Sequence, residues 1–238
     1  MSNSALQVAR TGLDAQNTKM RVIANNLANV NTTGFKRDRA QFETLAYQQV
    51  VQKGAAADQQ NKFATGLSLG TGVAVAGTAR IDTQGSLQTT GNSMDIAIQG
   101  SGYFQVQMPD GSTAYTRAGD FSITAEGAMV TSEGLPLQPQ IQVPQGATAI
   151  TIGADGTVSA TLAGQAEPSE LGRIEISNFI NSAGLESIGN NLLKETAASG
   201  APITGAAGEE GRGVLRQGML EGSNVNIVEE LVDMIETQ

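Results

Sequence analysis

Apolar side chains return at a fixed interval along the N-terminal part of the chain. They occupy two positions of a seven-residue repeat, the first held by Leu6, Leu13, Met20 and Leu27 and the second by Ala9, Gln16, Ile23 and Val30. This spacing is typical of the buried seam of a coiled coil, and only Gln16 interrupts it. No proline occurs before Pro109, so the pattern predicts one long helix.

The expected end of this helix is Gly34. A glycine in the left-handed conformation often closes a helix, and here it would bring Val30 against Phe35, as in a Schellman ending. The predicted N-terminal coiled-coil helix therefore covers residues 1–34.

A second helical pattern occupies the last residues of the chain. Asn226 is placed to cap it, with Glu229 three residues further on, as in a capping box. The apolar stripe of this helix consists of Val228, Leu231 and Ile235, flanked by Val232 and Met234. Residues 223–238 are thus predicted to start a C-terminal coiled-coil helix. Its stretch from Ile227 to Gln238 has only twelve residues, which is marginal for a helix without a partner.

Four asparagines lie near the end of the N-terminal pattern, at Asn25, Asn26, Asn29 and Asn31. Asparagine is unfavourable inside a helix, because its amide competes for backbone hydrogen bonds. Two interpretations stay open for the terminal helices. In the first, both helices pack on the central domain as ordinary amphipathic helices. In the second, the helices pair as a coiled coil that is held mainly by contacts with neighbouring copies. The second fits the asparagines better, since amides between packed helices can hydrogen-bond across them and fix their register.

The middle of the chain changes to short alternating runs separated by glycine-containing turns. The predicted strands are Val73–Ile81, Asp95–Ile98, Tyr103–Met108, Ala114–Arg117, Phe121–Thr124, Ile150–Ile152, Val158–Leu162 and Arg173–Phe179. The predicted hairpin turns are Asp110-Gly111, Glu126-Gly127, Glu133-Gly134 and Asp155-Gly156.

The fold class is therefore α+β and mainly β, with a central all-β, hairpin-rich domain and terminal helices that pair as a coiled coil. We assign residues 35–72 to a connecting arm, 73–198 to the β domain and 199–222 to a linker. A short helix is expected within the arm, around Phe42, Leu45 and Ala46.

Composition removes whole classes of chemistry. The chain of 238 residues contains no cysteine, histidine or tryptophan. Thiol nucleophiles, histidine triads and zinc sites built on these residues are therefore impossible. The net charge of −9 argues against nucleic acid as a partner, and no stretch is apolar enough for a lipid-spanning segment or a cleaved signal peptide.

Charge is distributed unevenly between the two ends. Residues 1–39 carry six basic and two acidic groups, whereas residues 205–238 carry two basic and seven acidic groups. Either these are two independently solvated surfaces, or the two ends meet.

Three local patterns suggest chemistry only weakly. Gly70-Thr71-Gly72, followed by Gly77, resembles a dinucleotide-binding loop. However, Val75 occupies the third glycine position of that motif, and the surrounding βαβ pattern is missing. Asn31-Thr32-Thr33 matches a glycosylation acceptor by chance. The carboxylates of a glycoside hydrolase would have to come from Asp82, Asp95, Asp110, Asp120 and Asp155. Several of these lie at predicted turns, where aspartate is favoured for backbone reasons. We expect no catalytic residues, no metal and no cofactor.

Longer motifs carry a family resemblance over essentially the whole chain. They are ANNLANVNTTGFKR at residues 24–37, GSGYFQV at 100–106, AYTRAGDF at 114–121 and SNVNIVEELVDMI at 223–235. Together they resemble the bacterial flagellar rod and hook proteins. The chain length, the segment around residues 47–66 and the segment 184–189 resemble the distal rod members of that family more than its hook members.

The resemblance implies a structural subunit, not an enzyme, that polymerises into the distal rod of the flagellar basal body and transmits torque from motor to hook. The implied partners are further copies in a helical homopolymer, the proximal rod proteins, the hook protein, the surrounding P and L ring proteins and the flagellar export apparatus. The implied location is the periplasm-spanning rod, reached by export without a cleaved signal peptide. The alternatives are a proximal rod or hook-type subunit, or a secreted enzyme acting on the cell wall.

Together with the resemblance, the periodic apolar positions predict the residues at the interface between subunits. The expected coiled-coil seam comprises Leu6, Leu13, Met20, Ile23, Leu27, Val30, Val228, Leu231, Val232 and Ile235. The family signature comprises Asn25, Asn26, Asn29, Asn31, Gly34 and Phe35. In this family the C-terminal helix usually continues further than Gln238, so we expect weak self-assembly from a chain of this length.

Overall fold

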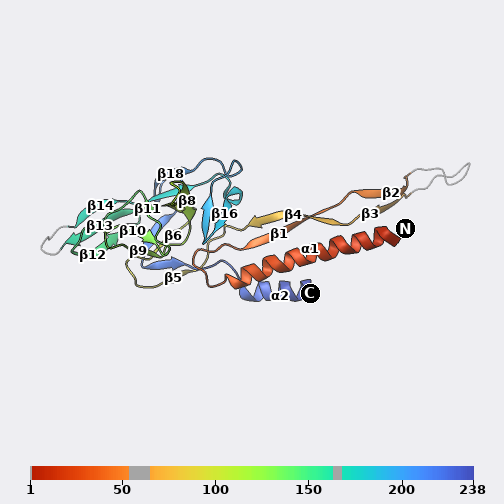
Figure 1. Cartoon of the computed structure of the whole chain (residues 1–238), viewed down its shortest axis with the longest axis horizontal. Coiled ribbons are helices and arrows are strands. Elements are labelled where there is room, and N and C mark those ends of the chain that lie inside the picture. Colours follow the sequence, from red (N-terminus) through yellow and green to blue (C-terminus); the bar gives the residue numbers. More distant parts are fainter. Residues whose placement is uncertain (1, 54–64, 163–167) are drawn as a thin grey trace, which may run out of the picture. The chain divides into compact units, whose positions relative to one another are not determined.

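The computed structural model describes residues 2–53, 65–162 and 168–238. The structure is mainly β, with one helix near each end of the sequence, which confirms the coarse fold class (Figure 1). The chain divides into two compact units. Unit 1 contains the described residues of Met1–Ala28, Asp38–Arg80 and Asn226–Gln238, and unit 2 contains those of Asn29–Arg37 and Ile81–Val225.

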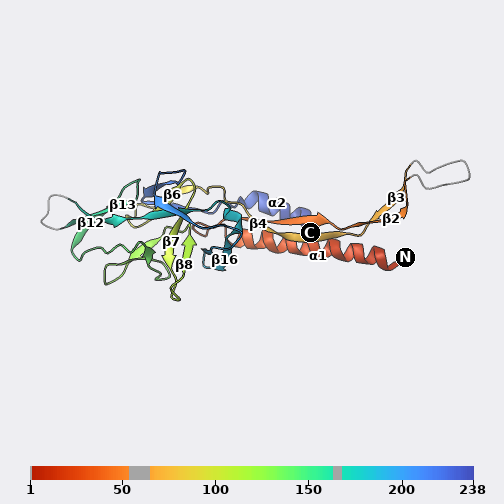
Figure 2. The ribbon, with the colours of Figure 1, turned by 90° about the horizontal axis from the view of Figure 1, so that it is seen from above.

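Unit 1 combines both helices with four strands. Its elements are α1 (Ser2–Ala28), β1 (Asp38–Thr44), β2 (Tyr47–Val51), β3 (Leu67–Gly70), β4 (Val73–Arg80) and α2 (Ile227–Thr237). β1 pairs with β4 in antiparallel register, with Asp38 opposite Arg80 and a bulge at Gln41–Phe42. β2 pairs with β3. α1 packs against α2, β1 and β4, and both ribbon views show α2 beside the C-terminal half of α1 (Figure 2).

Two expectations for this region are wrong. The N-terminal helix ends at Ala28 and does not reach residue 34, because the asparagine-rich segment that follows forms a turn, in which the backbone N–H of Thr32 donates to the oxygen of Asn29. The short helix expected around Phe42 is absent, and β1 stands there instead. The segment 35–72, expected as an arm, contains three paired strands. Most of their side chains are exposed, so the sequence lacks the regular alternation of apolar and polar residues from which strands are predicted.

Unit 2 is built from short antiparallel strands. They are β5 (Leu87–Thr89), β6 (Ile96–Gln99), β7 (Tyr103–Gln107), β8 (Thr113–Thr116), β9 (Phe121–Ile123), β10 (Met129–Thr131), β11 (Leu137–Gln138), β12 (Ala147–Ile152), β13 (Thr157–Leu162), β14 (Ser169–Arg173), β15 (Glu175–Asn178), β16 (Glu186–Gly189), β17 (Leu192–Lys194), β18 (Ile203–Ala206), β19 (Val214–Gln217) and β20 (Met219–Glu221).

The largest sheet of unit 2 has the order β16-β17-β8-β7-β15-β18, with β11 also paired to β7. The main apolar core contains Ile96, Ile98, Phe104, Met129, Leu137, Ile174 and Ile176, each fully buried. The rings of Phe104 and Phe121 pack at right angles to each other, with a centroid distance of 5.1 Å. The core therefore has few large side chains, which is consistent with a chain of only nine aromatics.

Strand prediction was most successful where turns are clearest. All eight predicted strands overlap observed ones, and Asp110-Gly111, Glu126-Gly127 and Asp155-Gly156 lie in the loops of the β7–β8, β9–β10 and β12–β13 hairpins. The expected linker 199–222 is wrong, since it contains β18, β19 and β20. These strands pair with β15, β6 and β5, so this Gly/Ala-rich segment is held by backbone hydrogen bonds to distant strands.

Candidate interaction surface and buried ion network

Exposed apolar side chains are concentrated in unit 1. Among the described residues, all but four of the exposed large hydrophobic side chains belong to this unit. The four in unit 2 are Ile123, Ile180, Ile188 and Ile203. Large exposed apolar surfaces on a folded protein mark sites of interaction with other molecules. Unit 1 is therefore the candidate interaction surface.

Helix α2 turns its apolar side away from the chain. Its buried side chain is Glu230, at 4% exposure, and Met234 is half-buried. The predicted stripe lies on the outside, with Val228 at 68%, Leu231 at 42%, Val232 at 50% and Ile235 at 74% exposure. An ordinary amphipathic helix buries its apolar face, so α2 has the reverse orientation. The predicted C-terminal seam is thus not used against α1 of the same chain.

The N-terminal seam is covered only in part. Leu6 and Leu13 are about two-thirds exposed, whereas Met20 and Leu27 are half-buried and Ile23 is buried. Ala15, which was not assigned to the seam, is also buried. Val30 lies beyond the helix in unit 2 and is half-buried. Contact of α1 with α2 thus exists, but within one chain it leaves the first half of the seam open.

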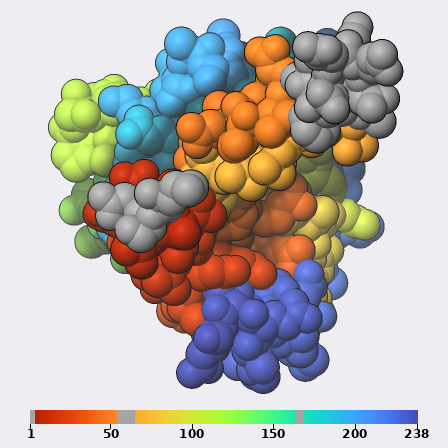
Figure 3. Space-filling view, turned by 90° about the vertical axis from the view of Figure 1, so that its right-hand side faces the viewer, coloured from red at the N-terminus to blue at the C-terminus, as the bar shows by residue number. Residues whose placement is uncertain are grey.

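Asn26 is the signature asparagine with a clear structural role in unit 1. Its Nδ2 donates to the backbone oxygen of Asp38 at 2.9 Å and to Glu230 Oε2 at 3.2 Å. Its Oδ1 accepts from the backbone N–H of Asp38 at 3.0 Å. The amide thus joins α1, β1 and α2 while only 2% exposed. The bond to Glu230 crosses from α1 to α2, as expected for an amide between packed helices, and it forms within one chain. Figure 3 shows α2 in blue beside α1 in red.

The other signature asparagines lie closer to solvent. Asn25 is exposed and lines a groove of about 400 Å³ with Thr18, Arg21, Val22 and Asp38. Asn29 is half-buried and accepts from the hydroxyl of Thr32 at 3.2 Å. Asn31 is exposed. Of the four signature asparagines, Asn26 is therefore buried and joins three elements, whereas the other three lie nearer the surface.

α2 begins at Ile227 and not at residue 223, but the predicted N-cap is confirmed. Asn226 is its N-cap, and its side chain accepts a hydrogen bond from the backbone N–H of Val228 at 3.1 Å. Glu229 and Glu230 follow in the first turn, where the helix dipole favours negative charge.

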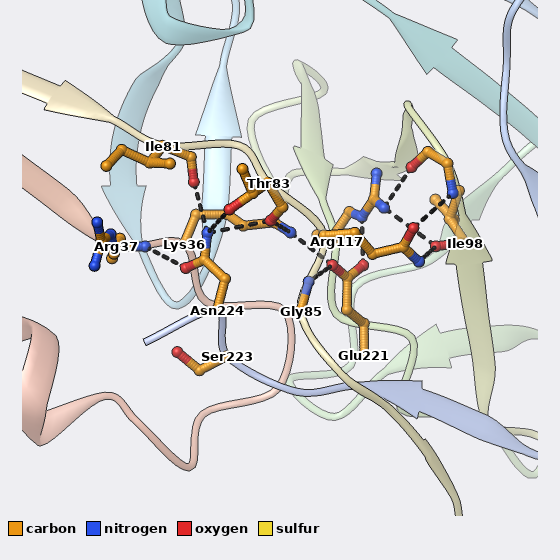
Figure 4. A network of polar contacts seen from close by, with 12 residues as sticks. Lys36, Arg37, Ile81, Thr83, Gly85, Ile98, Arg117, Glu221, Ser223 and Asn224 are labelled. Carbon is orange, nitrogen blue, oxygen red and sulfur yellow. Dashed lines mark hydrogen bonds and ion pairs between the residues drawn. The ribbon is translucent and has the colours of Figure 1, made fainter. Parts of the chain in front are cut away.

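Unit 2 contains a buried ion network centred on Glu221 (Figure 4). Its Oε1 lies 2.6 Å from Lys36 Nζ and accepts from the backbone N–H of Gly85 at 2.9 Å. Its Oε2 lies 2.6 Å from Arg117 Nε. The Glu221 side chain is fully buried, and the two cations are at most 7% exposed. One carboxylate thus holds together the segment after α1, the β8–β9 connection and the end of β20.

The remaining donors of the two cations are also satisfied. Lys36 Nζ donates to the backbone oxygen of Thr83 at 2.7 Å. The guanidinium of Arg117 donates to the backbone oxygens of Ile98, Gly100 and Gly102. Among the described residues, no buried side-chain nitrogen or oxygen lacks a partner. A buried charge is tolerable only in such a surrounding, because its desolvation is expensive.

Burial and attraction oppose each other in the pKa values of this network. Burial lowers the pKa of Lys36, and the hydrogen bond and charge of Glu221 only partly offset this. Burial by itself would raise the pKa of Glu221. The positive charge of Arg117 and the hydrogen bonds from Lys36 and Arg117 outweigh it, so that the pKa of Glu221 lies below its ordinary value.

Asn224 fixes the same segment from the other side. Its Oδ1 accepts from the backbone N–H of Arg37 at 2.7 Å, and its Nδ2 donates to the backbone oxygen of Ile81 at 2.7 Å (Figure 4). Its own N–H donates to the oxygen of Phe35 at 3.4 Å. The residues that follow α1 are therefore held between Ile81 and the stretch that leads to α2.

Gly34 is required in this arrangement. Its φ is +70°, and its N–H donates to the backbone oxygen of Glu221 at 2.8 Å. A Cβ at this position would lie 2.7 Å from the backbone of both Arg117 and Ala118. The predicted left-handed conformation is confirmed, although its function is close backbone packing and not the closure of α1.

The basic and acidic ends of the sequence meet in this network. Lys36 belongs to the basic N-terminal segment and Glu221 to the acidic C-terminal segment, and their charged groups are 2.6 Å apart. The structure thus confirms the second interpretation of the charge distribution. Sequence reasoning had not singled out Lys36, Arg117 or Glu221 as a network. The only signals in the sequence were the basic residues Lys36 and Arg117 within two of the motifs and the acidic excess of residues 205–238.

Three of the five aspartates considered for hydrolysis have structural roles. Asp110 accepts from the backbone N–H and hydroxyl of Ser112, and Asp155 does the same with Thr157. These hydrogen bonds lower the pKa of both aspartates. Asp95 accepts from Thr90 and Asn92. Across residues 2–53, 65–162 and 168–238, no three metal-ligating side chains are grouped together, and neither helix could cross a membrane.

Family models match three parts of the chain. A model described as flagella basal body rod protein matches residues 6–36. A model of the flagellar hook protein FlgE/F/G D1 domain matches residues 97–160. A model of the flagellar basal body rod FlgEFG protein C-terminal region matches residues 216–238. The matches include α1, the centre of unit 2 and α2.

Curated relatives match over nearly the whole chain. The flagellar basal-body rod protein FlgG of Buchnera aphidicola from Acyrthosiphon pisum is 51% identical over 98% of this chain and 90% of that protein. FlgG of Borreliella burgdorferi is 48% identical over 98% of this chain and 89% of that protein. The flagellar hook protein FlgE of Treponema pallidum is 42% identical over 54% of this chain, but over only 27% of its own length.

Proposed function

This chain belongs to the family of flagellar hook and basal-body rod proteins, and we propose that it is a structural subunit of the distal rod of the flagellar basal body. In this role it polymerises into a hollow shaft that transmits torque from the motor to the hook. Its immediate partners are other copies of the same chain.

One observation carries the proposal. The predicted stripe of α2 is exposed, although the same helix buries Glu230 against the chain. A helix that buries its polar side and exposes its apolar side is stable when another molecule covers the exposed side. A subunit made for polymerisation supplies that molecule as its neighbour.

The proposed assembly gives each predicted region a place. The two terminal helices form coiled-coil contacts in the inner layer of the tube through the seam residues of α1 and α2. The β domain faces the surrounding P and L rings. The proximal rod proteins and the hook protein contact the two ends of the shaft. The subunit reaches the periplasm-spanning rod through the flagellar export apparatus, without a cleaved signal peptide.

A hook-type subunit is the second candidate. The 42% identity to the Treponema pallidum hook protein supports it, but that match spans about a quarter of the hook protein. The basal-body rod relatives are matched along about nine-tenths of their length. We therefore favour the rod.

The test is electron microscopy of purified basal bodies from cells that produce this chain with a label in the Asp155-Gly156 turn. This turn joins β12 to β13 and is distant in sequence from both helices. Label along the outer part of the rod is the expected result. Label on the hook would instead favour the second candidate, and absence from basal bodies would overturn the proposal.

A further inference from the structure

A polar cavity of about 400 Å³ lies in unit 2, next to the buried ion network. Its polar lining comes from segments far apart in the sequence, at Asp82, Gln84, Ser101, Arg117, Asn178 and Ser182. Its volume lies within the range of roughly 300–1,000 Å³ that is usual for small-molecule sites. Such sites are mostly apolar, whereas this lining is mostly polar, so the cavity suits a ligand with polar groups on several sides.

The loop at one side of the cavity is held in place by hydrogen bonds. Arg117, which lines the cavity, donates to the backbone oxygens of Gly100 and Gly102. The amide of Gln84 holds the same loop, because its Oε1 accepts from the backbone N–H of Gly100 and its Nε2 donates to the oxygen of Ile98, both at 3.1 Å. The cavity is therefore preformed, and a ligand does not have to order this loop when it binds.

Asn178 offers the cavity a hydrogen-bond donor. Its Oδ1 accepts from the backbone N–H of Phe179 at 2.9 Å, which fixes the side chain. Within the described parts of the chain, no group accepts from its Nδ2 and no buried side-chain nitrogen lacks a partner, so this Nδ2 is accessible to solvent. An acceptor inside the cavity can therefore take a hydrogen bond from it.

Asp82 offers the cavity an acceptor and balances its charge. Its carboxylate is half-buried, and it lies close enough to Lys36 for the two charges to interact. The buried ion network holds two cations and one carboxylate, so the charges at the cavity cancel when Asp82 is included. A site without net charge attracts neither a phosphate nor a metal cation, and we therefore expect a neutral ligand.

Two aromatic rings give the cavity a small apolar side. Tyr103 and Phe179 both line it, and their ring centroids are 6.1 Å apart. Both residues are largely buried, so each presents only part of its ring to the cavity. Hydrogen-bonding groups on several sides and a small apolar side match a pyranose, which has hydroxyls around its edge and C–H groups on its faces.

We propose that this cavity binds a neutral pyranose, either as a free sugar or as one unit of a glycan. The Asp82 carboxylate accepts from one sugar hydroxyl, Asn178 Nδ2 donates to another, and the C–H groups of the sugar face Tyr103 and Phe179. An apolar peptide side chain fits less well, because it would leave Asp82 and Asn178 desolvated without new partners. The inference goes beyond the proposed function and does not rest on it.

Amide NMR of the full, isotopically labelled chain tests the binding. The neutral probes are glucose, N-acetylglucosamine, maltotriose and tri-N-acetylchitotriose, and the charged controls are inorganic phosphate and methylammonium. One small polar site predicts a Kd on the order of 1 mM. The expected result is a saturable shift of the Ser101, Gly102 and Phe179 amides with at least one sugar and no such shift with the charged controls.

Two results of this titration would overturn the inference. One is the absence of a saturable shift with every sugar up to about 50 mM, and the other is an equal shift with a charged control. Comparison of each trisaccharide with its monosaccharide identifies the source of the sugar. Binding of the trisaccharide that is about tenfold tighter supports a glycan, and an equal Kd supports a free sugar.

Substitutions then locate the binding within unit 2. Asn178→Asp keeps the acceptor for the Phe179 N–H but replaces the donor Nδ2 by an oxygen, and should raise the Kd about tenfold. Ser101→Leu, at an exposed position, should obstruct the cavity and raise the Kd at least as much. The matched control is Thr113→Ala, in a separate and larger groove of unit 2, which should leave the Kd unchanged.

Amide shifts far from the cavity should match those of the native protein in every variant, which shows that the variants fold. Unchanged binding by both Asn178→Asp and Ser101→Leu, or loss of binding by Thr113→Ala, would overturn the assignment of the cavity. These measurements record binding alone, so their failure leaves the proposed function intact, whereas absence from basal bodies refutes the proposed function and not this site.

Discussion

Lys36 Nζ and Glu221 Oε1 are 2.6 Å apart in the interior of unit 2, although 185 positions separate the two residues in the sequence. This ion pair fixes the residues that follow α1 to the end of β20, a few residues before α2 begins. Within unit 2, the stretch that follows α1 in the sequence is thereby joined to the stretch that precedes α2. The network is a structural anchor, since its donors and acceptors are satisfied by the chain itself.

Replacing Glu221 by glutamine should destabilise the protein by about 3–5 kcal/mol, because two buried cations lose the carboxylate that neutralises them. The measurement is the free energy of unfolding in urea. The matched control is Glu186→Gln, on the exposed strand β16, which should change stability by less than about 0.5 kcal/mol. Equal effects of the two substitutions would contradict the role of the network.

The contribution of Glu221 should also depend on pH. Its pKa in the folded protein lies below the ordinary value of 4.5, so the unfolded chain takes up the proton first as the pH falls. The stability difference between the native protein and Glu221→Gln should therefore be complete above about pH 5 and shrink below pH 4.5. Unfolding curves of both proteins between pH 3 and pH 7 measure it. A difference that grows on acidification would refute the assigned charge state.

Gly34→Ala should be more harmful than an alanine at a comparable turn. Gly34 has a φ of +70° and no room for a Cβ, whereas Gly134 has a φ of +84° and nothing within 4 Å of the added atom. Gly134→Ala should cost about 1 kcal/mol through its backbone conformation alone, and Gly34→Ala should cost at least about 2 kcal/mol more because of the clash. Thermal unfolding of the two variants checks the difference, and equal losses would show that the segment can move away.

Asn26→Ala should loosen α2. The substitution leaves the backbone groups of Asp38 and the buried carboxylate of Glu230 without one partner each, which costs about 1–3 kcal/mol. Amide hydrogen exchange in α2 should accelerate accordingly, whereas Asn31→Ala, at an exposed position, should have no effect. Unchanged exchange in the Asn26 variant would mean that this amide does not hold α2.

Much of the fold could be predicted because its signals are local. The β7–β8, β9–β10 and β12–β13 hairpins have turn residues with a defined backbone preference between alternating strands. The cap of α2 at Asn226 is equally local. The strands β18, β19 and β20 are only three or four residues long and show no regular alternation of apolar and polar residues. They pair with strands distant in the sequence, so no local pattern within residues 199–222 indicated them.

The sequence predicted that α2 has an apolar face, but not the direction in which that face points. Periodicity identified Val228, Leu231 and Ile235 as one face of a helix, and the structure places them on one face. Periodicity contains no information about whether that face meets the same chain or another one. The buried network is the opposite case, because Lys36, Arg117 and Glu221 meet only through tertiary folding and no spacing relates them.

The central claim is that the outward apolar face of α2 drives assembly into the rod, and the incorporation of Leu231→Asp into basal bodies tests it most directly. Leu231 is 42% exposed, so a single chain should tolerate aspartate there. The matched control is Ile203→Asp in unit 2, where the isoleucine is 47% exposed. Both variants should fold, as judged by unfolding curves close to that of the native protein. The account predicts that Ile203→Asp enters purified basal bodies normally and that Leu231→Asp is absent from them. Normal incorporation of Leu231→Asp would contradict it.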